Sequence, residues 1–353
     1  MIRYTIVRTL WIFIILFVVV SINFTMLRLA PEYPPPTEEE QEIYYERQVK
    51  DGLMTRRIVD GEEMEAIRDK EVDLHPNAHY FDEDDQLRLY EPIPIPRQYV
   101  TWMSNILTDW NWGVSQTIQP NVPVFDVLRS RIPVTMMLNL VALVFYIPIG
   151  FALGIIAALK KNSFADNAIS LGVMIFISIP SFVVMSLLLL TFGYQLGWFL
   201  TQYPASDIRG MARISSVFLP VLGLSFREIA SLTRVTRAEL SEVLTSEFLL
   251  LARTKGLTRT QSVLRHAMRN SMVPLVPGII ASFVGLLSGS VVIERIYGIP
   301  GTGRIFVSAM QENDYNLVIG ITAFYTIVSL FAVLLVDLSY GLVDPRIRMG
   351  GKK

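Results

Sequence analysis

The sequence predicts an all-α polytopic membrane protein with six transmembrane helices and an extracytoplasmic insertion after the first. Of the 353 residues, 52% are hydrophobic, and the mean hydropathy of +0.42 is too high for a soluble domain of this size. Uncharged runs recur along the chain at lengths near the roughly 20 residues that cross a bilayer. Clusters of Lys and Arg lie between these runs, at positions that would fall on one side of the bilayer.

The first predicted helix covers residues 1–30. Its uncharged run follows Arg3 and Arg8 and ends before Arg28. This run is longer than the apolar core of a secretory signal, and no small-residue cleavage site follows it before Arg28. The segment is therefore expected to be a retained membrane helix.

The other five helices are predicted in residues 127–353, the membrane domain. Their approximate ranges are 132–159, 167–198, 214–240, 270–293 and 315–342. Pro180 predicts a kink in the second of these, with an outer segment after it. The run from 214 to 226 is short, so it can span only if the helix continues through Arg227 and Glu228.

Basic clusters set the predicted orientation. They lie before the first helix, at Lys160–Lys161, between Arg253 and Arg269, and between Arg346 and Lys353. With six spans all four clusters fall on one side, which the positive-inside rule makes cytoplasmic. Both termini are then cytoplasmic.

Residues 31–126 are predicted to form an outer insertion. This segment has 21 Asp and Glu against 8 Lys and Arg, although the whole chain has a net charge of only −1. It contains a charged, helix-prone stretch at 37–70 and an extended proline-rich one at 91–96. Its acidity is explained either by a solvated outer face or by docking of a partner, and its fold is not predicted.

The inner loop at 244–269 is unusual for a connector. It is basic, and its helical pattern places Leu249, Leu250 and Ala252 on an apolar face. Gly256 then interrupts the helix before a second piece begins near Thr258. Such a short amphipathic helix suits either a groove in a partner protein or the surface of anionic lipid.

This loop resembles the signature of binding-protein-dependent ABC importer permeases, in the B-type subunit of the dipeptide/oligopeptide (peptide/nickel) branch. The similar segments are ARTKGL at 252–257 and RHAM at 265–268. Leu250-Leu251 stands where the general signature has Glu-Ala. The resemblance implies contact with an ATP-binding subunit through Leu250, Ala252, Arg253, Lys255, Gly256, Leu257 and His266.

The resemblance covers residues 1–30 and about 97–349, whereas the stretch at 32–96 is longer than the family leads us to expect. The other similar segments are RLAP, RSRIPVTMMLNL, PIGFALGIIAALKKNSFAD, SIPSFVV, VIERIYGIPGTGRIF, DYNLVIG and VDLSYGLVDPRIR. It implies an ABC transporter type-1 transmembrane domain in the cytoplasmic membrane of a prokaryote. The implied function is import of di- or oligopeptides by alternating access.

The implied partners are a second, homologous permease, two cytoplasmic ATP-binding subunits, an extracytoplasmic substrate-binding protein and the lipid bilayer, without nucleic acid. This chain would bind no cofactor, because ATP and magnesium are used by the partner subunits. The alternative within the resemblance is that the same machinery imports oligosaccharides or nickel chelates. An ion-coupled secondary transporter, the alternative of another class, would require internal repeats, and none is visible.

A glycine-rich turn at 298–304 resembles a phosphate-binding loop. However, Arg304-Ile305 stands where Lys and Ser or Thr would supply charge and a magnesium ligand. By the predicted topology the turn lies on the outer side. We interpret Gly298, Pro300, Gly301 and Gly303 as a turn that seals the outer mouth of the pathway.

Ionisable residues inside a span are candidates for function. Arg227 and Glu228 interrupt the fourth helix, and Asp337 interrupts the sixth. They line the substrate path, or they form structural ion pairs and extend towards the inner surface. The family usually has uncharged residues at the first two positions.

Two further patterns concern packing and chemistry. Gly150 with Gly154, and Gly285 with Gly289, are spaced for close helix contact within the subunit or with another permease. The chain has no cysteine, and His266 has no second ligand at metal-binding spacing. No catalytic constellation is visible, so we predict neither an enzyme nor a metal site.

Overall fold

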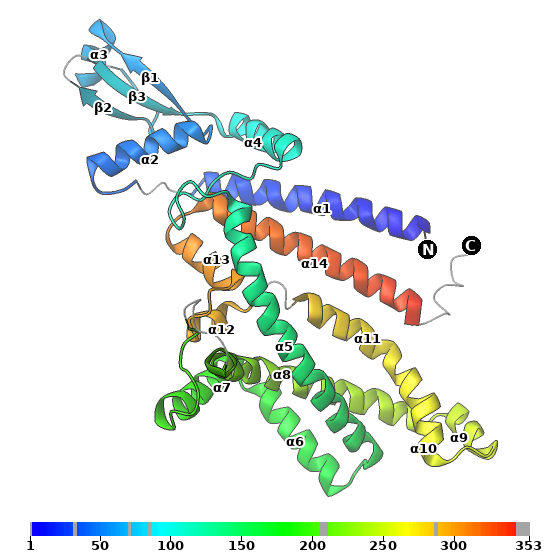
Figure 1. The fold of residues 1–353 in the computed structure, drawn as a ribbon. Helices are drawn as coiled ribbons and strands as arrows, with labels where there is room; N and C mark the ends of the chain where they lie inside the picture. Colours follow the sequence, from blue (N-terminus) through cyan, green and yellow to red (C-terminus); the bar gives the residue numbers. More distant parts are fainter. Residues whose placement is uncertain are drawn as a thin grey trace. The chain divides into compact units, whose positions relative to one another are not determined.

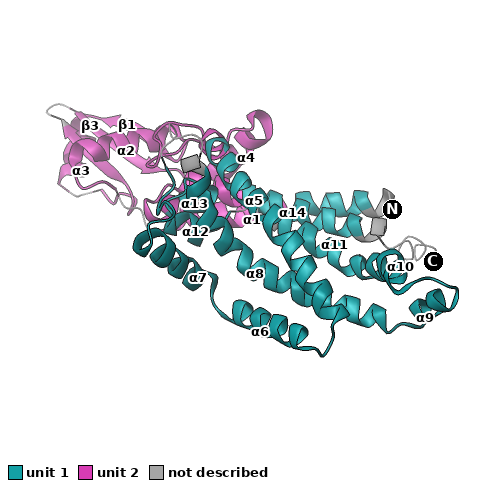
Figure 2. Cartoon of the chain, turned by 60° about the horizontal axis from the view of Figure 1, so that its bottom comes forward, with its two compact units in different colours: residues 1–14, 129–307, 324–353 teal, residues 15–128, 308–323 magenta. Residues whose placement is uncertain are grey.

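The computed structural model describes residues 2–30, 34–69, 72–83, 86–204, 211–285 and 289–343. Helices dominate these residues, and one small sheet is present (Figure 1). The chain divides into two compact units (Figure 2). Unit 1 contains residues 1–14, 129–307 and 324–353, and unit 2 contains residues 15–128 and 308–323.

Most of unit 1 is built from helices of the predicted membrane domain. They are α5 (Val124–Leu159), α6 (Phe164–Ser178), α7 (Ser181–Leu188), the π-helix η1 (Leu189–Gln195), α8 (Met211–Leu244), α9 (Glu247–Thr254), α10 (Arg259–Ser262), the π-helix η2 (Val263–Ala267), α11 (Met268–Gly285), α12 (Val291–Ile296) and α13 (Thr302–Gln311). The first 13 residues of α1 (Ile2–Arg28) and the last part of α14 (Tyr315–Val343) also belong to unit 1. The predicted boundary at 126/127 falls inside α5.

Four described helices are long and apolar enough to cross a membrane, namely α1, α5, α8 and α14. A fifth span is obtained if α6 and the α7–η1 segment count as one bent span, and α11 occupies the first part of the predicted 270–293 helix. The predicted helical membrane architecture is therefore confirmed, and the four or five spans among the described residues agree roughly with the predicted six. Helix α8 continues through Arg227 and Glu228, as the short apolar run required.

The predicted kink at Pro180 is confirmed and is large. The axes of the two helical segments that flank Ile179 and Pro180 differ by 98°. Pro180 precedes α7 with φ −57° and ψ 135°, so it cannot continue α6. After α7 the helix widens into η1.

The prediction of one helix over 270–293 is wrong. Helix α11 ends at Gly285, residues 286–288 lie outside the described residues, and Gly289 has φ +77°. This conformation is incompatible with a right-handed helix, so α12 is a separate element. Gly285 and Gly289 therefore do not form a small-residue pair within one helix.

Close helix contact is present at the other glycine pair. A Cβ atom built on Gly150 would lie 3.0 Å from Leu232 Cβ, and one built on Gly154 would lie 2.5 Å from Thr236 Cβ. Thr233 Oγ1 also donates a hydrogen bond to the Gly150 carbonyl oxygen at 3.2 Å. This pair thus packs α5 against α8 inside the subunit.

Unit 2 contains the predicted insertion, whose fold is a small α/β module. Its elements are α2 (Glu38–Lys50), β1 (Met54–Val59), α3 (Gly61–Arg68), β2 (His79–Glu83), β3 (Gln86–Pro92) and α4 (Ile95–Asp109). The strands form an antiparallel sheet in the order β1-β3-β2, with Met54 opposite Pro92 and Tyr80 opposite Leu89.

Part of the stretch expected to be helical is a strand. Residues 54–59 form β1, because Met54 and Val59 bury their side chains in two apolar clusters of the sheet. Tyr45 of α2 and Tyr90 of β3 belong to the first cluster. The extended proline-rich segment ends earlier than expected, since α4 begins at Ile95.

Gly154→Val tests the contact between α5 and α8. The added side chain would overlap Thr236 and cost about 1–3 kcal/mol of stability by overpacking. We expect a lower midpoint of thermal unfolding for the purified chain in detergent. Gly172→Val is the control, because a Cβ atom there meets nothing within 4 Å. Equal midpoints for the two variants would contradict this contact.

Candidate functional site

The basic inner segment has the form that its sequence indicated. Helix α9 ends at Thr254, and Gly256 follows with φ +93°, a conformation that glycine adopts without strain. Thr258 then caps α10. Its side chain accepts a hydrogen bond from the Gln261 N–H, and the Gln261 side chain accepts one from the Thr258 N–H.

The apolar residues of α9 point in two directions. Leu249 and Ala252 are buried, and Leu249 packs with Leu240 and Ala267. Leu250, by contrast, is 64% exposed. The predicted single apolar face is therefore wrong, because part of it anchors α9 to its own subunit.

An exposed apolar surface remains on α9, formed by Phe248, Leu250 and Leu251. The other predicted contact residues lie around it. Arg253, Lys255, Gly256 and His266 are exposed, and Leu257 is half-buried. The segment thus presents apolar side chains beside positive charge, held by a buried anchor.

The glycine-rich turn surrounds a carboxylate of the protein itself. Glu294 is fully buried, and its carboxylate accepts hydrogen bonds from Thr135 Oγ1 at 3.0 Å and from the Arg304 N–H at 2.8 Å. A Cβ atom on Gly301 would come within 2.3 Å of this carboxyl group. The sequence analysis missed Glu294, because nothing local distinguishes it from a surface acid.

Glycine is required at two other positions of this turn. Gly298 has φ +66°, and a Cβ atom on Gly303 would lie 2.8 Å from the Val291 N–H nitrogen. Gly298, Pro300, Gly301 and Gly303 therefore do form one tight turn. Its role at an outer mouth stays a prediction.

The three ionisable residues predicted in spans have different surroundings. Arg227 is exposed, whereas Glu228 is half-buried beside a small cavity. Asp337 forms an ion pair with Arg8 at 2.7 Å, so its carboxylate has a structural partner. Arg227 and Glu228 are neighbours on α8, whereas Asp337 on α14 has its own partner. The basic residues from Arg346 to Lys353 lie outside the described residues.

A second ion pair, with a buried carboxylate, fixes α8. Arg237 donates two hydrogen bonds to Asp166 at 2.5 and 2.8 Å, and the Asp166 side chain is 1% exposed. Asp166 also accepts a hydrogen bond from the Asn162 N–H at the start of α6. A bidentate pair of this kind fixes orientation as well as distance.

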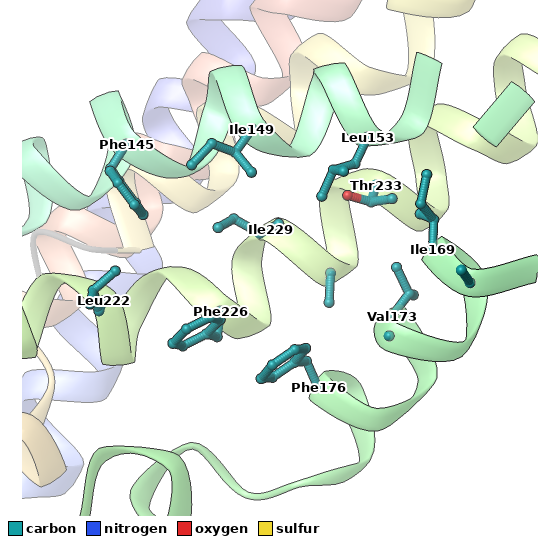
Figure 3. A pocket seen from close by; sticks show the side chains of 13 residues that line it. Phe145, Ile149, Leu153, Ile169, Val173, Phe176, Leu222, Phe226, Ile229 and Thr233 are labelled. Atoms are coloured by element: carbon teal, nitrogen blue, oxygen red, sulfur yellow. The ribbon is translucent and has the colours of Figure 1, made fainter. Parts of the chain in front are cut away.

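An apolar pocket of about 500 Å³ lies between α5, α6 and α8. Figure 3 shows Phe176 of α6 and Phe226 of α8 next to each other in its lining, where their rings stack with centroids 4.8 Å apart. Thr233 is the one residue with a side-chain polar atom among those that line it. Such a pocket offers no group that could recognise a polar substrate.

Unit 2 has its own buried carboxylate, which the sequence analysis also missed. Asp314 accepts hydrogen bonds from Ser115 Oγ at 2.5 Å and from the N–H groups of Gln116, Thr117 and Ile118 at 3.1–3.2 Å. Its other oxygen accepts a bond from the Leu317 N–H. Asp314 thereby caps α14 and holds the loop that precedes α5.

These features define an integral membrane protein with several apolar helices and an exposed basic segment on a rigid base. Residues 150–349 match the family described as binding-protein-dependent transport system inner membrane component. The chain belongs to this family. It is a multi-pass transport component of the membrane, and its curated relatives are named as permease proteins.

Curated relatives agree with this assignment. The chain is 36% identical to the dipeptide transport system permease protein DppB of Lactococcus lactis over 72% of this chain and 82% of that protein. It is 35% identical to DppB of Bacillus subtilis, over 73% and 81%. It is 33% identical to the oligopeptide transport system permease protein OppB of Escherichia coli K12, over 94% and 95%.

Asp51→Asn tests the polar network of unit 2. Asp51 accepts hydrogen bonds from Gln116 and Asn316 at 3.0 and 3.2 Å, and burial raises the pKa of its carboxyl above the ordinary value. The folded state therefore binds this proton more tightly than the unfolded state. Stability from this group is present at low pH and is lost as pH rises through the raised pKa.

An asparagine keeps an oxygen for both donors and carries no charge. We expect the variant to unfold at a higher temperature than the wild type at pH 7, with the difference shrinking towards pH 4. Thermal unfolding across this range measures it. Glu312→Gln, at an exposed position, is the control. A difference that does not depend on pH would contradict the prediction.

Proposed function

We propose that this chain is the permease subunit of an ATP-driven importer of di- and oligopeptides in the cytoplasmic membrane. The observation that carries the proposal is the similarity to dipeptide and oligopeptide permeases over 72–94% of the chain. The segment from Ser246 to Ala267 supports it, because it presents an exposed docking surface on a buried anchor.

The proposed partners are a second, homologous permease, two cytoplasmic ATP-binding subunits and an extracytoplasmic substrate-binding protein. The exposed side chains of Phe248, Leu250 and Leu251 would enter a groove in an ATP-binding subunit, with Arg253 and Lys255 at its rim. Closure of the ATPase pair would move α9, and the buried contact of Leu249 with Leu240 would pass this motion to α8.

We further propose that this chain binds no nucleotide. In the glycine-rich turn the Arg304 N–H donates to the Glu294 carboxylate, and a phosphate placed there would meet a negative charge instead of a lysine. ATP and magnesium would be used by the partner subunits. Both termini would be cytoplasmic.

The function is tested with the complete importer in proteoliposomes. Uptake of a radiolabelled tripeptide should require ATP, the loaded binding protein and this chain. ATP-binding subunits should copurify with the chain from membranes. Uptake of oligosaccharides or nickel chelates in place of peptides would overturn the substrate class.

Gly256→Val tests the docking segment. Valine at φ +93° is strained, so the turn must change and α9 must tilt. We expect peptide uptake to fall at least about tenfold, a loss of roughly 1.4 kcal/mol in coupling, while the chain stays inserted. ATP-dependent uptake and ATPase activity are measured together.

Gly197→Val is the matched control. Gly197 also has a positive φ, +63°, and a Cβ atom there meets nothing within 4 Å, as at Gly256. The backbone strain is therefore similar, but the residue lies outside the docking segment. Equal losses of uptake in the two variants would contradict a coupling role for Gly256.

A further inference from the structure

Glu228 differs from the other acidic groups buried in unit 1. Glu294 accepts hydrogen bonds from the protein, and Asp166 and Asp337 are paired with arginines. The Glu228 side chain has no hydrogen bond within the part of the chain that the structure describes, and the opposite charge that acts on it is that of the adjacent, exposed Arg227. A half-buried carboxylate in a membrane helix without a hydrogen-bond donor is costly, so a ligand with donor groups is expected for it.

Glu228 borders a cavity of about 110 Å³ between α5, α8 and α11. Three hydroxyl groups belong to residues of its wall, those of Tyr146, Ser231 and Ser282. Tyr146 is 2% exposed, and its buried hydroxyl group interacts with the Ser282 side chain. Hydroxyl groups from α5 and α11 therefore lie together at this cavity.

The chemistry of the cavity favours one kind of ligand. A primary ammonium has three N–H donors and one positive charge. One carboxylate and several hydroxyl oxygens provide the matching charge and acceptors. The volume is below the roughly 300 Å³ of a drug-sized pocket, so it accepts one end of a molecule and not a whole peptide.

We propose that the Glu228 cavity binds the N-terminal ammonium of a peptide during its passage through the membrane. This inference rests on the proposed function. The carboxylate supplies the opposite charge, and the hydroxyl groups accept the remaining hydrogen bonds. The apolar wall formed by Leu232, Val235 and Leu275 excludes competing water.

Glu228→Gln in the complete importer is the first test. The amide keeps the shape and removes the charge, so we expect tripeptide uptake at saturating loaded binding protein to fall at least tenfold. Glu228→Asp should recover most of the rate. Glu242→Gln is the matched control, because Glu242 is an exposed acid of the same helix and does not line the cavity. Complex yield and peptide-free ATPase activity should be unchanged in all three variants.

Methylammonium chloride is the second probe. It should inhibit uptake by the wild-type importer, relative to equal sodium chloride, and should not inhibit residual uptake by Glu228→Gln. Tetramethylammonium has the same charge and no N–H donor, so it should inhibit neither the wild-type importer nor the Glu228→Gln variant. Peptide binding to the isolated binding protein is measured under the same salts and should not change.

Gly278→Leu tests the cavity without altering the charge. Gly278 belongs to its wall, and a Cβ atom there meets nothing within 4 Å, so a larger side chain fills open space. We expect uptake to fall while the unfolding temperature does not. Gly172→Leu, also in open space but on α6, is its control.

Four results would overturn the inference. Unchanged uptake in Glu228→Gln would show that the cavity does not bind the peptide. If uptake and complex yield fall together, Glu228 serves assembly, by pairing with a basic side chain of the second permease. A response to sodium instead of methylammonium assigns an inorganic cation. Inhibition by methylammonium that persists in Glu228→Gln places its target elsewhere. Failure of the proposed function is distinguishable, because the wild-type importer itself would then not take up peptides.

Discussion

The close approach of α5 and α8 is the contact on which the rest of unit 1 depends. It exists because Gly150 and Gly154 have no side chains where Leu232 and Thr236 pack. In a bilayer, water does not drive helices together, so close packing of small residues and hydrogen bonds must hold them. Helix α8 carries Glu228 and leads at its C-terminal end into α9.

Buried carboxylates organise both units, and each has a different kind of partner. Asp166 has a guanidinium, Glu294 has a hydroxyl and a backbone N–H group, and Asp314 has a serine and several backbone N–H groups. Asp166 and Asp314 lie at the starts of helices and Glu294 faces the glycine-rich turn, since helix starts and turns leave N–H groups unpaired and an acceptor stabilises them. Glu228 lies inside a continuous helix, where the backbone N–H groups are already paired. Its carboxylate oxygens therefore receive no backbone hydrogen bond.

The docking segment combines a rigid base with an accessible surface. Leu249 and Ala252 belong to the core of the subunit, and Leu250 and Leu251 face outward one residue away. An α-helix allows this because successive side chains point about 100° apart. In the proposed coupling role, a force on the outer residues would therefore act on α8 through the contact of Leu249 with Leu240.

The sequence by itself determined the helical membrane architecture, the kink at Pro180, the break at Gly256 and the family, because apolar runs, proline, glycine and ordered motifs are local signals. Only the tertiary structure decided which face of α9 is buried, that residues 54–59 pair as a strand, and that α11 and α12 are separate. It also decided that Glu294 and Asp314 are buried anchors and that Glu228 borders a cavity. These properties depend on residues distant in sequence, such as Thr135 for Glu294 and Ser115 for Asp314. No local pattern records such contacts, since the same acid is equally compatible with a solvated surface.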